Sequence, residues 1–189
     1  MGFVTGFLLA APFLCIGLYD LSRHLERNQA FRWRDTLANM IARRWDMGLL
    51  VVFQAVVLIA WLRLATLLHA LYFTHSGSSV SGLFEQLFTT SQGLGFTSVF
   101  VLSGALLAIA IFVSSVVAWP MLLDRDSSTL VAVATSFNAV KQNIPAMLVW
   151  AYLIVALIAL GFATFFIGLI VILPLIGHAT WHAYRDLVE

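Results

Sequence analysis

Residues 47–72 read MGLLVVFQAVVLIAWLRLATLLHALY, and this stretch decides the fold because it is long and apolar enough to cross a membrane. A helix of about 20 apolar residues spans the hydrocarbon core of a bilayer. Three side chains interrupt the apolar character of the run: Gln54, Arg63 and His69. The stretch therefore predicts one transmembrane helix that carries a charge, Arg63, at membrane depth.

The composition extends this prediction to the whole chain. Of the 189 residues, 61% are hydrophobic and 10% are charged, and the mean hydropathy is +0.97, whereas soluble domains contain about 25% charged residues. The net charge of +1 argues against a nucleic-acid partner, which would require a concentrated basic face. The single cysteine, Cys15, can form neither an intrachain disulfide nor a cysteine cluster for a metal. We expect one all-α domain over residues 1–189, a polytopic transmembrane helical bundle.

Apolar runs separated by polar segments predict about five spans. The run that begins at Ile144 is divided near Gly161, because about 33 residues of helix would reach roughly 50 Å against about 30 Å of hydrocarbon. Pro120 is expected to end the third span, and Asn143 with Pro145 has the pattern of a cap and first-turn proline for the fourth. The spans cover approximately residues 1–19, 47–72, 94–119, 144–160 and 163–183.

The basic residues predict the orientation. Nine of the ten Lys and Arg residues lie in segments 20–46 and 120–143 or at the C-terminal end, and the tenth is Arg63. Segment 73–93 contains no Lys or Arg. Because basic residues accumulate on the cytoplasmic side, we expect 20–46, 120–143 and the C-terminus inside, and 73–93 as an outer loop. An outside N-terminus that begins directly in an apolar run raises the hypothesis that a further span precedes this chain.

Two cytoplasmic segments contain apolar residues at helical spacing. The first set is Trp33, Leu37, Met40 and Ile41, opposite Asp35, Asn39 and Asp46, and the second set is Leu130, Val133, Ala134 and Phe137. This pattern predicts two amphipathic helices that lie in the inner interface of the membrane. An ordinary solvated connector helix is the alternative interpretation of the first set.

Arg63 is the best single candidate for a functional residue, because a charge at membrane depth is costly unless it is paired, snorkelling or in a wet cavity. The predicted spans contain no Asp or Glu. The remaining partners are Glu85 of the outer loop, His69 and a lipid phosphate. Snorkelling of the guanidinium towards the outer headgroups is the alternative without a specific function.

Two histidines four residues apart, His178 and His182, share one face of the last span, as two ligands of a metal or haem would. The candidates for a third ligand are Asp124, Asp126, Asp186 and His24. The glutamate that follows the first histidine in zinc hydrolases is missing. The alternative is an interfacial belt, in which these imidazoles, Trp181 and Tyr184 form hydrogen bonds with their neighbours. No other cofactor is expected.

The sequence Asp124-Arg125-Asp126 predicts a cytoplasmic polar hub for basic residues at the inner ends of other helices. The residues that the hub would hold are Arg23, Lys141 and Arg185. An exposed cluster of this kind contributes little to stability. The sequence contains no Gly-x-Ser-x-Gly, Walker or dinucleotide-binding glycine pattern, so we expect no enzymatic activity.

Three motifs together resemble those of a bacterial family of predicted integral membrane proteins of unknown function. They are Gly17-Leu-Tyr-Asp-Leu-Ser-Arg-His-Leu-Glu26, Pro120-Met-Leu-Leu-Asp-Arg-Asp126 and Gly177-His-Ala-Thr-Trp-His-Ala-Tyr-Arg-Asp186. The resemblance covers essentially the whole chain and implies a location in the bacterial inner membrane. Members of that family usually have an additional N-terminal span. Some are labelled as cytochrome c oxidase subunits, which implies an association with an oxidase at most, because this sequence lacks the span-buried histidines of the catalytic subunit.

These observations predict a non-enzymatic membrane protein that works by association, either as an accessory subunit of a larger complex or with copies of itself. Two sets of small residues favour close helix packing: Gly2, Gly6 and Ala10, and Gly104 with Ala108. The alternative is a transporter or channel for a small solute or a lipid. In this alternative Arg63 lines a cavity, and helix kinks at Pro12 and Pro174 open that cavity. Ion-coupled transporters usually carry intramembrane carboxylates, and their absence favours association.

Overall fold

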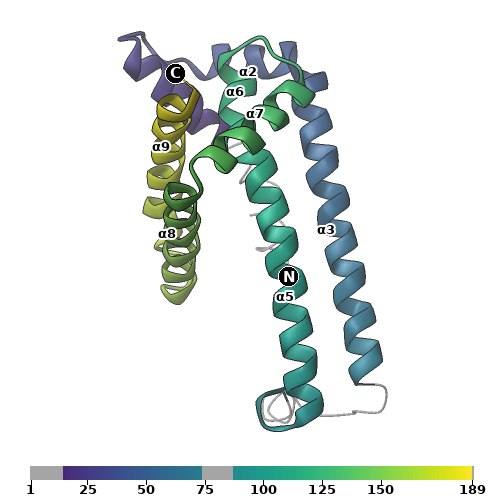
Figure 1. Ribbon diagram of the computed structural model, residues 1–189. Helices are drawn as coiled ribbons and strands as arrows, with labels where there is room; N and C mark the ends of the chain where they lie inside the picture. Colours follow the sequence, from purple (N-terminus) through teal and green to yellow (C-terminus); the bar gives the residue numbers. More distant parts are fainter. Residues whose placement is uncertain (1–14, 74–86, 189) are drawn as a thin grey trace. The chain divides into compact units, whose positions relative to one another are not determined.

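The computed structural model describes residues 15–73 and 87–188 (Figure 1). In this part of the chain every regular element is a helix. Residues 15–26 are helical, and the labelled helices are α2 (Trp33–Ala42), α3 (Arg44–Tyr72), α5 (Ser91–Ser115), α6 (Ala118–Asp124), α7 (Thr129–Gln142), α8 (Ile144–Ala163) and α9 (Leu169–Val188). The predicted all-α class is confirmed.

Three helical stretches of the described chain are long and apolar enough to cross a membrane: Arg44–Tyr72, Ser91–Asp124 and Ile144–Ala163. The predicted spans 47–72, 94–119 and 144–160 fall within them. The last predicted span, 163–183, overlaps α9, which begins at Leu169 and is not among the three. The count of five spans therefore stays a prediction. Most of the first span, with Gly2, Gly6, Ala10 and Pro12, and Glu85 of the outer loop lie outside the described residues.

The described helices divide into two compact units, which we treat separately. One unit is Val51–Phe112, and the other combines Met1–Leu50 with Val113–Glu189. We call them the hairpin unit and the platform unit. Helix α3 begins in the platform unit and continues into the hairpin unit, and α5 leads back.

Helices α3 and α5 pack closely in the hairpin unit because glycines of α5 lie under aromatic rings of α3. A Cβ on Gly104 would lie 2.9 Å from Cη2 of Trp61, and one on Gly95 would lie 3.3 Å from a ring carbon of Tyr72. The Trp61 ring also packs against Phe100, with 4.8 Å between centroids. The close approach predicted from Gly104 is therefore made within this chain.

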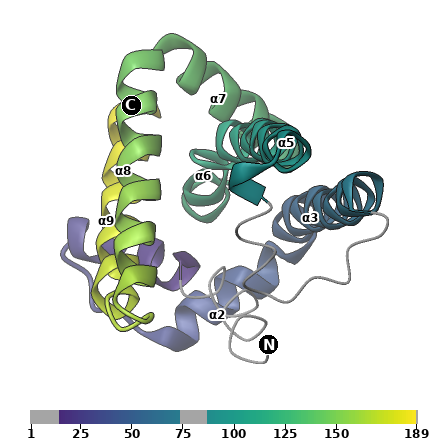
Figure 2. The ribbon, with the colours of Figure 1, turned by 90° about the horizontal axis from the view of Figure 1, so that it is seen from below.

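Helix α6 lies at the centre of the platform unit, and residues 15–26, α7 and α9 pack around it. Its side chains Leu122 and Leu123 are almost completely buried, as are Trp181 and Tyr184 of α9. Helix α9 also contacts residues 15–26, since a Cβ on Gly177 would lie 2.8 Å from a side-chain carbon of Leu18. Figures 1 and 2 both show α8 and α9 lying side by side.

A turn at residues 116–117 separates α5 from α6, four residues before Pro120. The cause is Ser136 of α7, whose hydroxyl donates to the carbonyl of Val113 at 2.7 Å and accepts the N–H of Val117 at 3.2 Å. A side chain inserted in this way replaces a helical i→i−4 hydrogen bond and bends the helix.

The sequence expectation that Pro120 ends the third span was wrong. Pro120 occupies the first turn of α6, which runs on to Asp124. Proline is tolerated there because the first N–H groups of a helix have no intrahelical partner. The break between α5 and α6 is caused by the hydroxyl of Ser136 in α7, not by the proline.

The predicted division of the run after Ile144 is confirmed, although the turn lies slightly later than Gly161. Helix α8 starts after Asn143 with Pro145 in its first turn, and α8 ends at Ala163. The turn contains two residues in the left-handed region, Phe165 and Phe166, with φ of 50° and 68°. The Thr164 hydroxyl accepts the Gly168 N–H at 2.9 Å and so closes the turn.

Candidate functional site

Polar side chains from several elements gather at the C-terminal end of α6. The last carbonyl groups of a helix have no partner within the helix, and cations near them are stabilising. Here Arg43 donates to the Leu122 carbonyl at 3.1 Å, and Arg23 donates to the Leu123 carbonyl at 3.0 Å. Asn39 of α2 also reaches the Leu123 carbonyl, at 3.4 Å. Guanidinium and amide groups from residues 15–26, from α2 and from Arg43, which directly follows α2, therefore cap a buried helix end.

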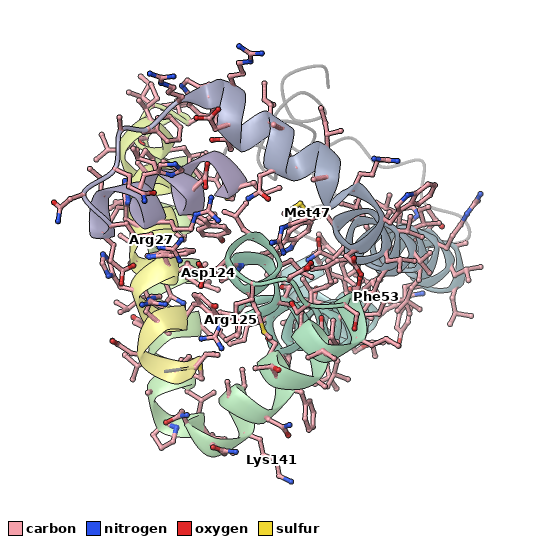
Figure 3. The ribbon with its side chains drawn as sticks, turned by 90° about the horizontal axis from the view of Figure 1, so that it is seen from above. Arg27, Met47, Phe53, Asp124, Arg125 and Lys141 are labelled. Carbon is pink, nitrogen blue, oxygen red and sulfur yellow. The ribbon has the colours of Figure 1, made fainter. Side chains whose placement is uncertain are left out.

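Asp124, the last residue of α6, is surrounded by hydrogen-bond donors and cations (Figure 3). Its side chain is only 4% exposed and lies 2.9 Å from Nη2 of Arg27 and 3.7 Å from Nη1 of Arg185. The hydroxyl of Tyr184 donates to the same carboxylate at 3.1 Å and accepts from Nε of Arg125 at 3.1 Å. Two segments far apart in sequence, Arg27 at the end of the helix of residues 15–26 and helix α9, thus meet at one carboxylate.

Glu26 extends this polar cluster along α9. Its carboxylate accepts from Nε1 of Trp181 and from Nε of Arg185, both at 3.0 Å. The hydrogen bond from Trp181 is the main cause that lowers the pKa of Glu26, and the charge of Arg185 adds to it. Burial of the phenol, together with the charge of Asp124, raises the pKa of Tyr184 to about 12. Both groups therefore keep their charge states through the neutral range.

Asp20 forms a second, fully buried polar group between residues 15–26 and α2. Oδ2 accepts from the Thr36 hydroxyl at 2.5 Å, and Oδ1 lies 2.5 Å from Nη2 of Arg23. Because burying a charge is costly unless it is paired and hydrogen-bonded, these two contacts make the carboxylate tolerable. Arg23 consequently bridges Asp20 and the end of α6.

The structure brings together three of the four residues predicted to form the hub. Asp124, Arg125 and Arg185 meet around Tyr184, whereas Asp126 is fully exposed and lies 3.9 Å from Arg43. Of the basic residues expected at the hub, Arg185 reaches Asp124, Arg23 binds the neighbouring carbonyl, and Lys141 points away from the unit (Figure 3).

Three residues of this cluster were not among the predicted site residues: Asp20, Glu26 and Arg27. Tyr184 was expected only as a member of an interfacial belt that forms hydrogen bonds with its neighbours. Glu26 and Arg27 lie in the polar segment after the first apolar run, and their sequence pattern does not distinguish them from charges exposed to solvent. The one available signal was Asp20, a carboxylate directly after an apolar run, where a charge would need a partner.

The two histidine side chains, His178 and His182, have different surroundings and do not share a binding partner among the described residues. Nδ1 of His178 lies 2.5 Å from the Ser22 hydroxyl, while His182 is exposed. Over residues 15–73 and 87–188, no group of three or more His, Cys, Asp or Glu residues is placed to hold a metal ion. Binding of a metal or haem at His178 and His182 stays a prediction.

Arg63 lies exposed on α3, in the hairpin unit. Successive residues of a helix turn by about 100°, so Arg63 points about 200° away from Trp61. Because Trp61 faces Gly104 of α5, Arg63 faces away from α5. No carboxylate of the described residues pairs with it.

Comparison with known proteins gives one relationship. No curated protein and no solved structure matches the chain. The sequence model of one family, described as "Predicted integral membrane protein (DUF2189)", matches residues 1–124. This match includes the first of the three motifs, the second as far as Asp124, and the end of α6. The family has no established function. The three apolar helices of spanning length are consistent with the description of the family. The chain belongs to this family of predicted integral membrane proteins.

Proposed function

We propose that this protein acts by association within the membrane, without enzymatic activity, as an accessory subunit of a larger complex or with copies of itself. The observation that carries the proposal is the position of Arg63 on the face of α3 opposite α5. A cation on an apolar, outward face calls for an anionic group from outside the hairpin unit.

The depth of Arg63 supports a specific contact near the outer surface. It lies 19 positions after Arg44, the first residue of α3, which corresponds to about 28 Å of helix at 1.5 Å per residue. The hydrocarbon core is about 30 Å thick. A guanidinium at this level can meet either a carboxylate of a neighbouring protein or a lipid phosphate. Our proposal is that Arg63 pairs with a carboxylate of a neighbouring protein.

The proposed arrangement is that of a multi-pass protein of the bacterial inner membrane, with five spans. The cluster of arginines in the platform unit then lies at the cytoplasmic side together with the C-terminus, as the positive-inside rule favours. Helices α2 and α7 lie in the inner interface, and the residues after Tyr72 face outwards.

Native mass spectrometry of the protein extracted from its own membrane tests this proposal. We expect a stoichiometric complex with a partner or with further copies, which Arg63→Leu dissociates and Arg63→Lys retains in part. Leu106→Ala is the control, because Leu106 is an exposed residue of α5 in the same unit and should not affect the complex. A complex unchanged by Arg63→Leu, or a monomer in every preparation, would refute the proposal.

The alternative function, transport of a small solute or lipid, needs Arg63 to line a cavity. Within its unit Arg63 points away from the other helix, so the walls of such a cavity would have to come from other parts of an assembly. If Arg63→Leu abolished anion binding or transport and left the complex intact, the alternative would replace our proposal.

A further inference from the structure

Helix α2 is amphipathic in the reverse sense to a helix of a soluble protein. Its polar side faces the platform unit: Thr36 is buried and donates to Asp20, and Asn39 donates to the end of α6. Its apolar side faces outwards, with Leu37 54% and Ile41 63% exposed. Exposed apolar side chains that gather on one face mark a surface that another phase or molecule covers.

Two tryptophans extend this outward face at both ends of α2. Trp33 is 59% exposed and rests one edge of its ring on Gly17, where a Cβ would lie 2.6 Å away. Trp45, at the start of α3, is 76% exposed. Tryptophan is enriched at the level of the lipid headgroups because its ring is apolar and its N–H is polar. The face therefore has the composition of a membrane interface.

Three arginines lie beside these apolar side chains, and all of them are exposed: Arg32, Arg34 and Arg44. None of the three pairs with a carboxylate of the described residues, unlike Arg23, Arg27 and Arg185. The Arg44 guanidinium lies over the ring of Trp45, 5.5 Å from its centroid. Asp35 is the one exposed carboxylate on α2, and its position on the helix is about 200° from Trp33.

Helix α7 repeats this reversed arrangement in the same unit. Thr129 and Ser136 are buried, and Leu130 and Phe137 are exposed. Lys141 extends outwards from the last turn of the helix (Figure 3). Two helices of one unit thus combine an outward apolar face with a basic side chain, which is the pattern of helices that lie in an anionic membrane surface.

We propose that the outward face of α2 binds anionic phospholipids of the cytoplasmic leaflet, with Trp33, Leu37, Ile41 and Trp45 inserted between the chains and Arg32, Arg34 and Arg44 on the phosphates. The occupant follows from charge: three guanidiniums that no carboxylate of the described residues neutralises, on an apolar face, complement a layer of phosphates above hydrocarbon. One N–H of Arg44 is used by the Ile41 carbonyl, at 3.1 Å, and the other donors of that guanidinium stay available. The inference rests on the interfacial placement of α2 in the proposed function.

Electron paramagnetic resonance of the full chain in bilayers, with spin-labelled phosphatidylglycerol or phosphatidylcholine, tests the inference. We expect preferential association of phosphatidylglycerol that weakens as salt is added. Each arginine near an anionic surface contributes up to about fivefold to association. The triple variant Arg32→Gln, Arg34→Gln, Arg44→Gln should therefore lose most of the preference, and the matched triple exchange to Lys should keep most of it.

Quenching of tryptophan fluorescence by brominated phosphatidylcholine, compared between the native chain and Trp45→Phe, tests the placement separately. Normal quenching of Trp45 without a preference for phosphatidylglycerol would overturn the inference and leave the interfacial placement intact. No quenching of Trp45 would overturn both.

A preference that the triple Gln variant retains would also overturn the inference. If that variant instead lost a protein partner in native mass spectrometry, with lipid association unchanged, α2 would be a protein-docking surface. The association function has its own test at Arg63, so it can fail or stand independently.

Discussion

Asp20 and Thr36 share a hydrogen bond of 2.5 Å in the interior of the platform unit, where both side chains are almost completely buried. This contact joins residues 15–26 to α2, and so holds the outward face of α2 in place. Thr36→Val preserves the shape of the side chain and removes the donor. Loss of a hydrogen bond to a buried charged group costs about 1.5–3 kcal/mol, so we expect a clearly lower Tm in detergent.

Thr135→Val is the control for Thr36→Val. The Thr135 hydroxyl bonds to the Val131 carbonyl within its own helix, and its loss should change Tm little. Thr36→Ser should restore most of the stability, because it restores the donor. Equal Tm values for Thr36→Val and Thr135→Val would contradict the role given to the buried pair.

The bend between α5 and α6 depends on a single hydroxyl, that of Ser136. Ser136→Ala leaves the Val113 carbonyl and the Val117 N–H without their partner. An unsatisfied buried group costs about 1–3 kcal/mol, so we expect a lower Tm. Ser103→Ala, which removes a bond to the backbone of its own helix, is the control, and a comparable loss of Tm there would contradict the prediction.

Gly104 and Gly48 make a matched pair of glycines in spanning helices. A Cβ on Gly104 would lie 2.9 Å from the Trp61 ring, whereas nothing lies within 4 Å of one on Gly48. Gly104→Ala should cost about 1–3 kcal/mol through overpacking, and Gly48→Ala should stabilise the helix by about 0.5–1 kcal/mol. Thermal unfolding measures both, and the tryptophan emission should shift in Gly104→Ala alone.

The spanning helices could be predicted from the sequence because their cause is local. An apolar run of sufficient length forms a helix in a membrane whatever its neighbours are, and α3 and α8 agree with the predicted spans to within a few residues. Asn143 and Pro145 likewise marked the start of α8 correctly. The polar segments became helices where the apolar spacing indicated them, in α2 and α7.

The contacts that build the site could not be predicted, because each partner lies far away in the sequence. Ser136 bends a helix at Val117, and Glu26 binds Trp181 and Arg185. The helical spacing of Asn39 placed it on a polar side expected to meet solvent, yet it binds the end of α6. Spacing defines the face of a helix, and only tertiary structure decides which face is covered.

The stability of the platform unit should depend on the charge of Glu26. Its pKa in the folded protein is lowered, first by the Trp181 hydrogen bond and then by Arg185. The stabilisation is therefore fully present above the unfolded pKa, at about pH 5 and higher, and is lost as pH falls through the lower folded value. Glu26→Gln should have a lower Tm than the native chain at neutral pH, and the difference should shrink in acid. A difference that stays constant down to the acid limit would contradict this assignment.

The neighbouring carboxylates Asp124 and Asp126 should respond very differently to neutralisation. Asp124 is 4% exposed and meets Arg27, Arg185 and Tyr184, while Asp126 is fully exposed with one guanidinium at 3.9 Å. Breaking a buried pair costs about 3–5 kcal/mol, and the half-exposed Arg27 reduces this, so Asp124→Asn should cost about 2–4 kcal/mol. Asp126→Asn should change stability by less than about 0.5 kcal/mol.

A double-mutant cycle of Asp124→Asn with Arg27→Gln then separates the hub from the single pair. Arg27 is 51% exposed, so its own replacement should cost under about 1 kcal/mol. Because Arg185 and Tyr184 also hold Asp124, most of the loss in Asp124→Asn should persist in the Arg27→Gln background. If Asp124→Asn cost no stability in the Arg27→Gln background, Asp124 would serve Arg27 alone. The elements around the end of α6 would then have to be held by their apolar contacts and by the arginines on the α6 carbonyls.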